Sequence, residues 1–358
     1  MDLEIAPQHA TLRNAVRELA QSIALPLAEE VDRDHRFPLE AVKAASEAGL
    51  LGVLIPTEYG GAGLDALAFA ICIEELAQAC ASTSVIVDVH TSVGSEPILL
   101  FGTEDQKRKW LPRLASGELL GAFALTEPAS GSDASSLKAS ARRTGSGYVL
   151  NGTKTFITNV GHAGLYVVFA RSGPEERAAG VSAFLVPADT PGLRIGQVFK
   201  KMGLNGSPTG ELVLEDVVVP QENRLGSDGQ GFTVAMRALD SGRIGISGQA
   251  LGIAISAAVV YAQTAMQEHP ERADETRELA EAFCNQAQHR TERLFHELWS
   301  NADAGNHRLA LDVLSGRHTW LEEGVIDPST GDGPMVPPLE TDRGVPVEVP
   351  TATAGSGP

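Results

Sequence analysis

Residues 146–158 have the sequence SGYVLNGTKTFIT, in which apolar and polar side chains largely alternate. Alternation with a period of two, in a run rich in aromatic and β-branched residues, predicts a half-buried β-strand. The Asn151-Gly152 pair inside this run predicts a tight hairpin turn, because both residues accept the positive φ angles that a two-residue turn requires. The middle of the chain is therefore expected to be β-structure.

Further strand-like segments surround this one, between about Leu120 and Leu225. Turn sequences such as NGSPTG (205–210) and SDGQG (227–231) follow them at short intervals, and no crossover helix fits between them. Short connections of this kind favour an antiparallel sandwich or barrel over a parallel sheet. The segments are GAFALTE (121–127), LYVVFARS (165–172), VSAFLVP (181–187) and GELVLEDVVVP (210–220).

The residues before this region have a helical pattern, with apolar side chains every three or four positions over about 6–117. A bundle of amphipathic helices is expected there. Pro26 should interrupt the first helix, and the glycine-rich segment at 56–63 should connect two later ones. Thr103 is followed by two acidic residues and is therefore the predicted N-cap of another helix.

The residues after the strands are helical again, beginning with a long stretch of small and apolar residues at 232–265. Such a helix is expected to be buried on several sides or to lie at a subunit interface. More polar helices are predicted at 271–299 and 306–323. Seven of the chain's twenty prolines follow Gly324, so the tail at 324–358 is predicted to be disordered.

These patterns together predict an α+β fold, with an N-terminal helical bundle, a middle antiparallel β-sandwich or barrel, and a C-terminal helical domain. At 358 residues the chain is long enough for two or three domains. The predicted divisions are 1–118, 119–231 and 232–323, followed by the tail at 324–358.

The composition is that of a folded soluble protein, with 43% hydrophobic and 21% charged residues. The formal net charge of -18 excludes the long-range positive field that would gather nucleic acid or an anionic membrane. No stretch approaches the roughly 18 apolar residues that cross a bilayer, and the N-terminus has no recognisable export or import signal, so a cytoplasmic location is expected. The cysteines show no metal-binding spacing, and Cys72 and Cys80 are predicted to be buried.

Several motifs, taken in order, resemble those of the acyl-CoA dehydrogenase family and of its short-chain members most. The resemblance extends over about residues 1–263. It implies the fold of that family and an FAD-dependent α,β-desaturation of a short-chain acyl-CoA, by removal of the α-proton and hydride transfer to flavin N5. The motifs are PTEYGGAG (56–63), LTEPASGSD (125–133), NGTKTFITN (151–159), KMGLNGS (201–207) and LDSGRIGISGQALGIA (239–254).

The LTEPASGSD segment supplies polar atoms of the kind that a flavin nucleotide needs. The predicted strand exits through Thr126, Pro128 and Gly131, leaving backbone N–H groups and hydroxyls that could hold a flavin edge and a pyrophosphate without any lysine. A strand-end turn without a ligand is the alternative. The resemblance implies FAD contacts for Phe123, Leu125, Thr126, Gly131 and Ser132, with Ser132 reaching the FAD pyrophosphate or the CoA moiety.

The NGTKTFITN segment is expected to bring an aromatic ring and a hydroxyl to the same ligand. Side chains two apart share a face of a strand, so Lys154, Phe156 and Thr158 are predicted on one side. The family commonly has a tryptophan against the flavin where this chain has Phe156, and its threonine matching Thr158 bonds near N5. Phe156 keeps the stacking surface without the indole N–H. The alternative is that Phe156 belongs to the core of the sheet.

The LDSGRIG segment is expected to meet the substrate. Asp240 and Arg243 are three apart on a helix and therefore share a face. The resemblance implies that both contact the nucleotide end of CoA, where Arg243 offers the charge that an anionic ligand needs. It also implies that Phe232 covers the same channel. An intrahelical ion pair without a ligand is the alternative interpretation of Asp240 and Arg243.

The catalytic base that this reaction needs is not identified by the sequence. Abstraction of the α-proton requires a positioned glutamate whose proton affinity is raised by burial. Short-chain members carry it in a C-terminal Tyr-Glu-Gly-Thr segment that this chain lacks, and the site used by branched-chain members corresponds to Gly242. Glu323 precedes a glycine as the family base does, although a solvated helix-end carboxylate is the commoner explanation. His90, His162 and His289 have no catalytic or metal-ligand spacing.

Three functional interpretations follow from these features. The first is a catalytic acyl-CoA dehydrogenase whose base comes from the diverged helices or from a partner chain. The second is a non-catalytic flavin- or acyl-CoA-binding member of the family, and the third is an oxygen-using flavin monooxygenase of the same fold. The resemblance implies an acyl-CoA substrate, electron-transfer flavoprotein as the electron acceptor, and a homodimer or homotetramer formed through the helix at 232–265.

Overall fold

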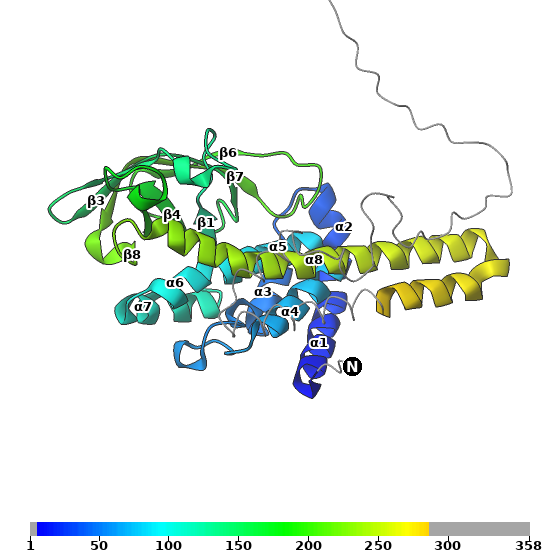
Figure 1. Cartoon of the computed structure of the whole chain (residues 1–358). Helices are drawn as coiled ribbons and strands as arrows, with labels where there is room; N and C mark the ends of the chain where they lie inside the picture. Colours follow the sequence, from blue (N-terminus) through cyan, green and yellow to red (C-terminus); the bar gives the residue numbers. More distant parts are fainter. Residues whose placement is uncertain (1–5, 286–358) are drawn as a thin grey trace, which may run out of the picture. The chain divides into compact units, whose positions relative to one another are not determined.

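The computed structural model of the chain describes residues 6–285, and its N-terminal part is helical, as the apolar periodicity predicted (Figure 1). The break expected at Pro26 is a π-helical turn that separates α1 from α2. Thr103 caps α7: its hydroxyl accepts from the N–H of Gln106, and the Gln106 side chain accepts from the N–H of Thr103. The elements are α1 (Pro7–Leu19), η1 (Ala20–Ala24), α2 (Leu25–Arg33), α3 (Leu39–Glu47), η2 (Leu50–Gly52), η3 (Thr57–Tyr59), α4 (Ala66–Ala79), α5 (Ala81–Val89), η4 (His90–Ser95), α6 (Glu96–Phe101) and α7 (Glu104–Ala115).

The middle of the chain forms one hydrogen-bonded sheet with the strand order β6-β7-β3-β2-β4-β5-β8, and β1 pairs with β4. Most pairings are antiparallel, as predicted, but β4 runs parallel to β1 and, at one residue pair, to β2. The predicted α+β class, with helices before and after a middle sheet, is confirmed. The strands are β1 (Gly121–Ala124), β2 (Ser140–Arg143), β3 (Gly147–Thr158), β4 (Leu165–Arg171), β5 (Val181–Pro187), β6 (Leu193–Val198), β7 (Thr209–Pro220) and β8 (Arg224–Leu225).

Strand β4 is buried on both faces and joins two hydrophobic cores. Alternate side chains of a strand point to opposite faces of the sheet. One set of β4 side chains therefore packs in a first core against the helices, and the other set packs in a second core on the opposite face. The first core includes residues of α7 and of the long C-terminal helix, whereas the second contains only residues of the sheet and its loops. The first set is Leu165, Val167 and Phe169, and the second is Tyr166, Val168 and Ala170.

The predicted hairpin at Asn151-Gly152 is wrong, because β3 runs through this pair without turning. The register against β7 shifts there: Leu150 pairs with Val217 and Gly152 with Leu214, so β7 contains one extra residue. The Asn151 amide donates to a carboxylate oxygen of Asp216 (3.0 Å), and the Asp216 N–H donates back to Asn151 Oδ1 (2.9 Å). The Asn151 side chain therefore hydrogen-bonds to the bulged residue Asp216 of the neighbouring strand. The sequence of one strand does not reveal such a bulge in its partner.

The predicted shared face of Lys154 and Phe156 is also wrong. A second register shift lies between Lys154 and Ile157, where the backbone of Phe156 adopts a φ of 59°. An extra residue in a strand resets the alternation of its side chains. The Lys154 side chain is therefore fully buried, whereas Phe156 is 68% exposed.

The long helix predicted at 232–265 is α8 (Gly231–Glu268), which runs along α4 and α5 (Figure 1). Its glycines allow close contact: a Cβ built at Gly248 would lie 2.6 Å from the Ala70 carbonyl oxygen, and one at Gly252 would lie 2.3 Å from that of Glu74. Its length and hydropathy would also suffice to cross a membrane, which corrects the expectation that no segment would. One face of the helix packs on α4 and α5, whereas 28% of its apolar stretch is buried.

A short 3-10 turn, η8 (Pro270–Arg272), follows α8, and residues 273–285 are helical, where a second polar helix was predicted. The rest of that helix, the helix predicted at 306–323 and the tail at 324–358 lie outside the described residues. The predicted domain boundaries fall between α7 and β1 and at the start of α8, and they stay predictions. Cys72 and Cys80 are buried, as predicted.

Candidate functional site

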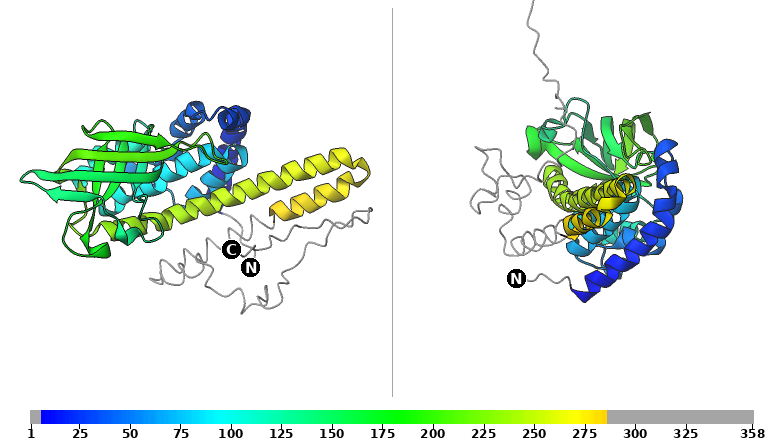
Figure 2. Two further views of the ribbon diagram at one scale, coloured as in Figure 1. Left: turned by 90° about the horizontal axis from the view of Figure 1, so that it is seen from above. Right: turned by 90° about the vertical axis from the view of Figure 1, so that its right-hand side faces the viewer.

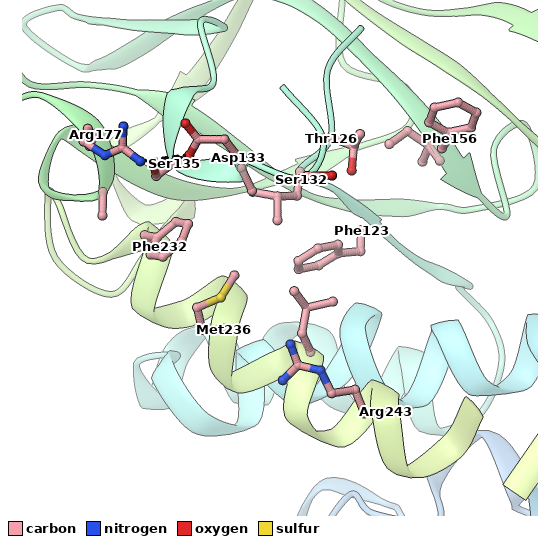
Figure 3. A pocket seen from close by; sticks show the side chains of 16 residues that line it. Phe123, Thr126, Ser132, Asp133, Ser135, Phe156, Arg177, Phe232, Met236 and Arg243 are labelled. Carbon is pink, nitrogen blue, oxygen red and sulfur yellow. Dashed lines mark hydrogen bonds and ion pairs between the residues drawn. The ribbon is translucent and has the colours of Figure 1, made fainter. Parts of the chain in front are cut away.

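A cavity of about 670 Å³ lies where the sheet meets the first turns of α8 (Figure 3). Its walls come from β1 and the loop after it, the bulge of β3, the 3-10 turn η6 (Arg177–Gly180) and one stripe of α8. A volume of this size suits a small-molecule ligand or cofactor. The lining residues are Phe123, Leu125, Thr126, Gly131, Ser132, Asp133, Ala134, Ser135, Phe156, Ile157, Arg177, Ala178, Phe232, Met236, Leu239 and Arg243.

Every residue that the sequence suggested for the cofactor or the substrate lines this cavity, except Thr158 and Asp240. Thr158 ends β3 and pairs with Thr209 of β7, while Asp240 lies on α8 beside Arg243. The residues brought together come from segments more than a hundred positions apart in sequence, so their meeting is a result of the fold. Their individual contacts with a ligand stay predictions.

Two hydroxyl groups on the sheet side of the cavity are available to a ligand. The side chains of Thr126 and Ser132 make no hydrogen bond within residues 6–285, and Figure 3 shows them across the cavity from α8. The loop that carries them is closed by reciprocal backbone bonds between Glu127 and Ser130, at 3.0 and 3.1 Å. These hydroxyls can therefore bond to an entering polar group without giving up a partner in the protein.

Phe156 forms an aromatic wall of the cavity. Its side chain is 68% exposed, so its assignment to the core of the sheet is wrong. The left-handed backbone at a bulky aromatic residue costs free energy and persists only where neighbouring structure holds it. Here the ring lies against Phe199, with 5.4 Å between ring centroids, and its other surface is free to stack on a planar ligand.

The helical side of the cavity is a stripe of α8 that begins with Phe232 and ends with Arg243. Met236 and Leu239 lie between them at four- and seven-residue spacing, which places all of these side chains on one face of the helix. Arg243 donates to Asp240 at 2.6 Å, so the intrahelical ion pair exists, and its guanidinium still borders the cavity. The ion pair and a ligand contact are therefore compatible.

Sequence reasoning missed part of the lining. Met236 and Leu239 could have been found from their spacing after Phe232. Arg177 could not, because it comes from a loop between β4 and β5 that has no motif of its own. Its guanidinium donates to Asp133 at 3.1 Å, and both residues lie at the rim of the cavity (Figure 3).

Among the described residues, Asp133 is the carboxylate that lines the cavity. Hydrogen bonds from Ser136 and Ser135, together with the charge of Arg177, lower its pKa, which is opposite to what a base for a C–H proton needs. Burial raises the pKa of Asp88 to about 8 and that of Glu96 to about 7, but neither residue lines the cavity. Gly242 is buried but does not line the cavity, and Glu323 lies outside the described residues.

The two described histidines that the sequence singled out have structural surroundings. His90 is fully buried, and its Nδ1 accepts the N–H of Gly121 at 2.9 Å. The ring of His162 stacks on Phe37, with 3.9 Å between ring centroids. His289 lies outside the described residues. Over residues 6–285, no group of histidine, cysteine and acidic side chains could hold a metal ion.

The described fold has an aromatic, hydroxyl-lined cavity between its sheet and its long helix, which is typical of proteins that bind a small-molecule cofactor, and comparisons identify the family. Sequence models for the acyl-CoA dehydrogenase N-terminal and middle domains match residues 6–118 and 122–217. An acyl-CoA dehydrogenase of Bacillus subtilis is 46% identical over 74% of this chain and 71% of its own length. The mouse mitochondrial short-chain enzyme is 46% identical over 73% of this chain and 64% of its own.

Solved structures agree with these matches. Butyryl-CoA dehydrogenase from Megasphaera elsdenii superposes with a TM-score of 0.75 and 33% identity, over 88% of this chain and 86% of that one. An acyl-CoA dehydrogenase from Bacillus anthracis, solved with FAD, gives 0.70 and 39% identity over 75% of this chain and 45% of that one. This chain belongs to the acyl-CoA dehydrogenase family, whose members are FAD-dependent oxidoreductases. The exposed Phe156 ring and the free hydroxyls of Thr126 and Ser132 fit that cofactor.

Proposed function

We propose that this chain binds FAD in the cavity and desaturates a short-chain acyl-CoA between its α and β carbons. The observation that carries the proposal is the cavity itself, which combines an exposed aromatic ring, free hydroxyls and a helical stripe that ends in a cation. The aromatic ring matches the flavin ring system, the hydroxyls match the polar groups of the nucleotide, and the cation matches an anionic second ligand.

Each wall of the cavity has a separate part in this proposal. The Phe156 ring packs against the isoalloxazine, and the hydroxyls of Thr126 and Ser132 bond to polar atoms of FAD. Phe232, Met236 and Leu239 exclude water from the acyl chain. FAD, when bound, accepts the hydride that leaves the β carbon.

The α-proton base is proposed to come from residues 286–358 or from a partner chain. The only cavity-lining carboxylate in the described residues, Asp133, has a lowered pKa, and a base for this step needs a raised one. Glu323 is the candidate within the chain. Electron-transfer flavoprotein is the proposed acceptor, and the cytoplasm the proposed location.

Self-association is proposed to use the second half of α8. Figure 2 shows this part of the helix extending past the sheet, and the apolar residues Ile253, Val260 and Tyr261 are exposed there. Exposed apolar side chains along one helix are typical of surfaces that bind another protein chain. A homodimer or homotetramer formed through α8 would cover them, and sedimentation of the purified protein would measure it.

Anaerobic titration with butyryl-CoA tests the proposed activity. The FAD-loaded protein is expected to lose its flavin absorption band as the flavin is reduced, because a short acyl chain fits the stripe of α8 and the β-hydride has an acceptor. A Glu323→Gln variant that binds FAD but keeps the band would assign the base to Glu323, whereas a variant that still bleaches would assign it to another carboxylate of residues 286–358 or to a partner chain. A wild-type protein whose band survives short, medium and branched acyl-CoAs would favour the non-catalytic alternative.

A Gly242→Glu variant separates a missing base from a missing binding site. A Cβ at Gly242 would lie 3.3 Å from Val93 Cγ1 and 3.6 Å from Ser92 Oγ, so a Cβ needs only a small shift of the Val93 side chain. FAD affinity and Tm of the variant are measured first, to show that the longer glutamate is accommodated. If the wild type binds FAD and butyryl-CoA without bleaching, and this variant bleaches, then the chain has the binding site and lacks only the base. If both bleach, the wild type has its own base.

The role of Arg243 is tested by an Arg243→Gln variant. Loss of a charge-assisted contact is expected to raise the Kd for butyryl-CoA on the order of 10-fold to 100-fold, without changing FAD binding. The matched control is Arg194→Gln, because Arg194 also has one carboxylate partner at 2.7 Å, Glu215, but lies on β6 outside the cavity. Equal Kd values for the two variants would remove Arg243 from the substrate site.

A further inference from the structure

We propose that the buried ion pair between Lys154 and Glu127 is a positioning device that holds the backbone at Leu125 and Thr126 in place for the flavin. This inference rests on the proposed function, because it assigns a task to residues behind the cavity wall. Neither Lys154 nor Glu127 lines the cavity, whereas Leu125 and Thr126 do. The two residues therefore act through the segment that they hold.

The lysine reaches the loop from the neighbouring strand. Its ammonium group donates to the Leu125 carbonyl oxygen at 3.0 Å and to Glu127 Oε1 at 2.8 Å. The side chain of Lys154 is 0% exposed, so its charge has no water to replace these contacts. The next residue of β3 continues the connection, because the Thr155 N–H donates to the Thr126 carbonyl oxygen at 2.9 Å.

Glu127 connects the same loop to the residues that lead into β2. Its Oε2 accepts the N–H of Lys138 at 2.6 Å, and its Oε1 accepts the N–H of Ala139 at 2.9 Å. Residues 125–127 are thus held from β3 on one side and from the approach to β2 on the other. Thr126, whose free hydroxyl faces the cavity, lies between these attachments. Small displacements of this backbone would move Leu125 and Thr126, which line the proposed flavin site.

Stability alone does not account for this pair. Removing a lysine and a carboxylate from water is costly, and a neutral pair of similar volume often leaves a protein as stable or more stable. Burial lowers the pKa of Lys154, while the charge of Glu127 opposes that change. The Lys154 ammonium group holds the Leu125 carbonyl and the Glu127 carboxylate together in one fixed arrangement. A neutral, flexible pair would not provide this.

The test uses the full chain and a double variant, Lys154→Met with Glu127→Gln, which removes both charges and leaves no unpaired ion. The glutamine oxygen can accept only one of the two N–H groups of Lys138 and Ala139, and the Leu125 carbonyl loses the bond from the ammonium group. FAD affinity is measured by quenching of flavin fluorescence, and Tm by circular dichroism. The expected result is an increase in the Kd for FAD on the order of 10-fold, together with a fall in Tm because buried backbone groups lose their partners.

The matched control replaces a cation by methionine and a glutamate by glutamine in an ion pair that lies away from the cavity. Arg17 donates to Glu75 at 2.9 Å between α1 and α4, and Arg13 donates to the same carboxylate at 3.0 Å. Arg17→Met with Glu75→Gln therefore removes both ion pairs of Glu75, while Arg13 keeps its bond to Glu74 at 2.7 Å. This control is expected to leave the Kd for FAD unchanged. If the Tm of both double variants falls equally, a raised Kd in the Lys154 variant alone still supports the proposal.

Two results would overturn the inference in different ways. If the wild type binds FAD and the Lys154 double variant binds it equally well, or if both double variants weaken FAD binding to the same extent, the ion pair is only structural and the proposed function stands. If the wild type binds no FAD after reconstitution, the proposed function and this inference fail together.

Discussion

Replacing Asp88 by asparagine is expected to stabilise the protein by roughly 5 kcal/mol at pH 8 and by less than about 2 kcal/mol at pH 5. Asp88 is 1% exposed on α5, and burial raises the pKa of its carboxyl to about 8. Within residues 6–285, its carboxyl group accepts one hydrogen bond, from the Ser92 hydroxyl at 3.3 Å. Gly245 of α8 makes room for it, since a Cβ there would lie 1.9 Å from Asp88 Oδ1.

The direction of the pH effect follows from proton binding. The folded protein keeps the Asp88 proton up to about pH 8, whereas the unfolded chain loses it near the ordinary value of 3.8. Stability from this group is therefore fully present below that ordinary value and is lost as the pH rises toward 8. Asparagine does not titrate, so the variant avoids this loss.

Urea unfolding of the full chain at both pH values measures the difference. Burial lowers the pKa of the neighbouring His90 to about 4, so His90 destabilises the fold in acid, but it does so equally in both proteins and cancels from the comparison. Asp189→Asn, at an exposed position, is the control and should change little. A stabilisation by Asp88→Asn that is the same at both pH values would show that Asp88 does not titrate as described.

A Gly94→Ala variant is expected to lower the free energy of unfolding by about 3 kcal/mol, because it overpacks a backbone contact. A Cβ at Gly94 would lie 2.8 Å from the carbonyl carbon of Gly121 and 2.9 Å from its Cα. These are backbone atoms, so no flexible side chain can move aside. The contact joins η4 of the helical part to the first residue of β1.

The same substitution is expected to weaken FAD binding. Gly121 is held by the bond from its N–H to His90 and by a bond from the Asn159 amide to its carbonyl oxygen at 3.2 Å. Displacing β1 would move Phe123 and Leu125, which line the cavity. Gly145→Ala is the control, since a Cβ there meets nothing within 4 Å. Unfolding midpoints and FAD affinities that do not differ between the two variants would contradict the prediction.

The sequence predicted much of the candidate site because its motifs occupy strand ends and one helix face. Phe232 and Arg243 reach the cavity through the regular geometry of α8, which a helical pattern already contains. Phe156 reaches it for a different reason: a bulge reverses the side on which its ring lies, and Lys154 is buried instead. Arg177 lies at the rim because its loop is closed by the pairing of β4 with β5 and by an ion pair with Asp133.

The sequence by itself determined the order of helices and strands, the helix cap at Thr103 and the family, because periodicity, caps and motifs are local properties of a chain. Only the tertiary structure decided that Asn151 completes a bulge, that Lys154 turns inward to Glu127, and that Asp88 is enclosed against Gly245. Bulges and the surroundings of buried ionisable groups depend on which strand or helix lies opposite, and that neighbour comes from a distant part of the chain.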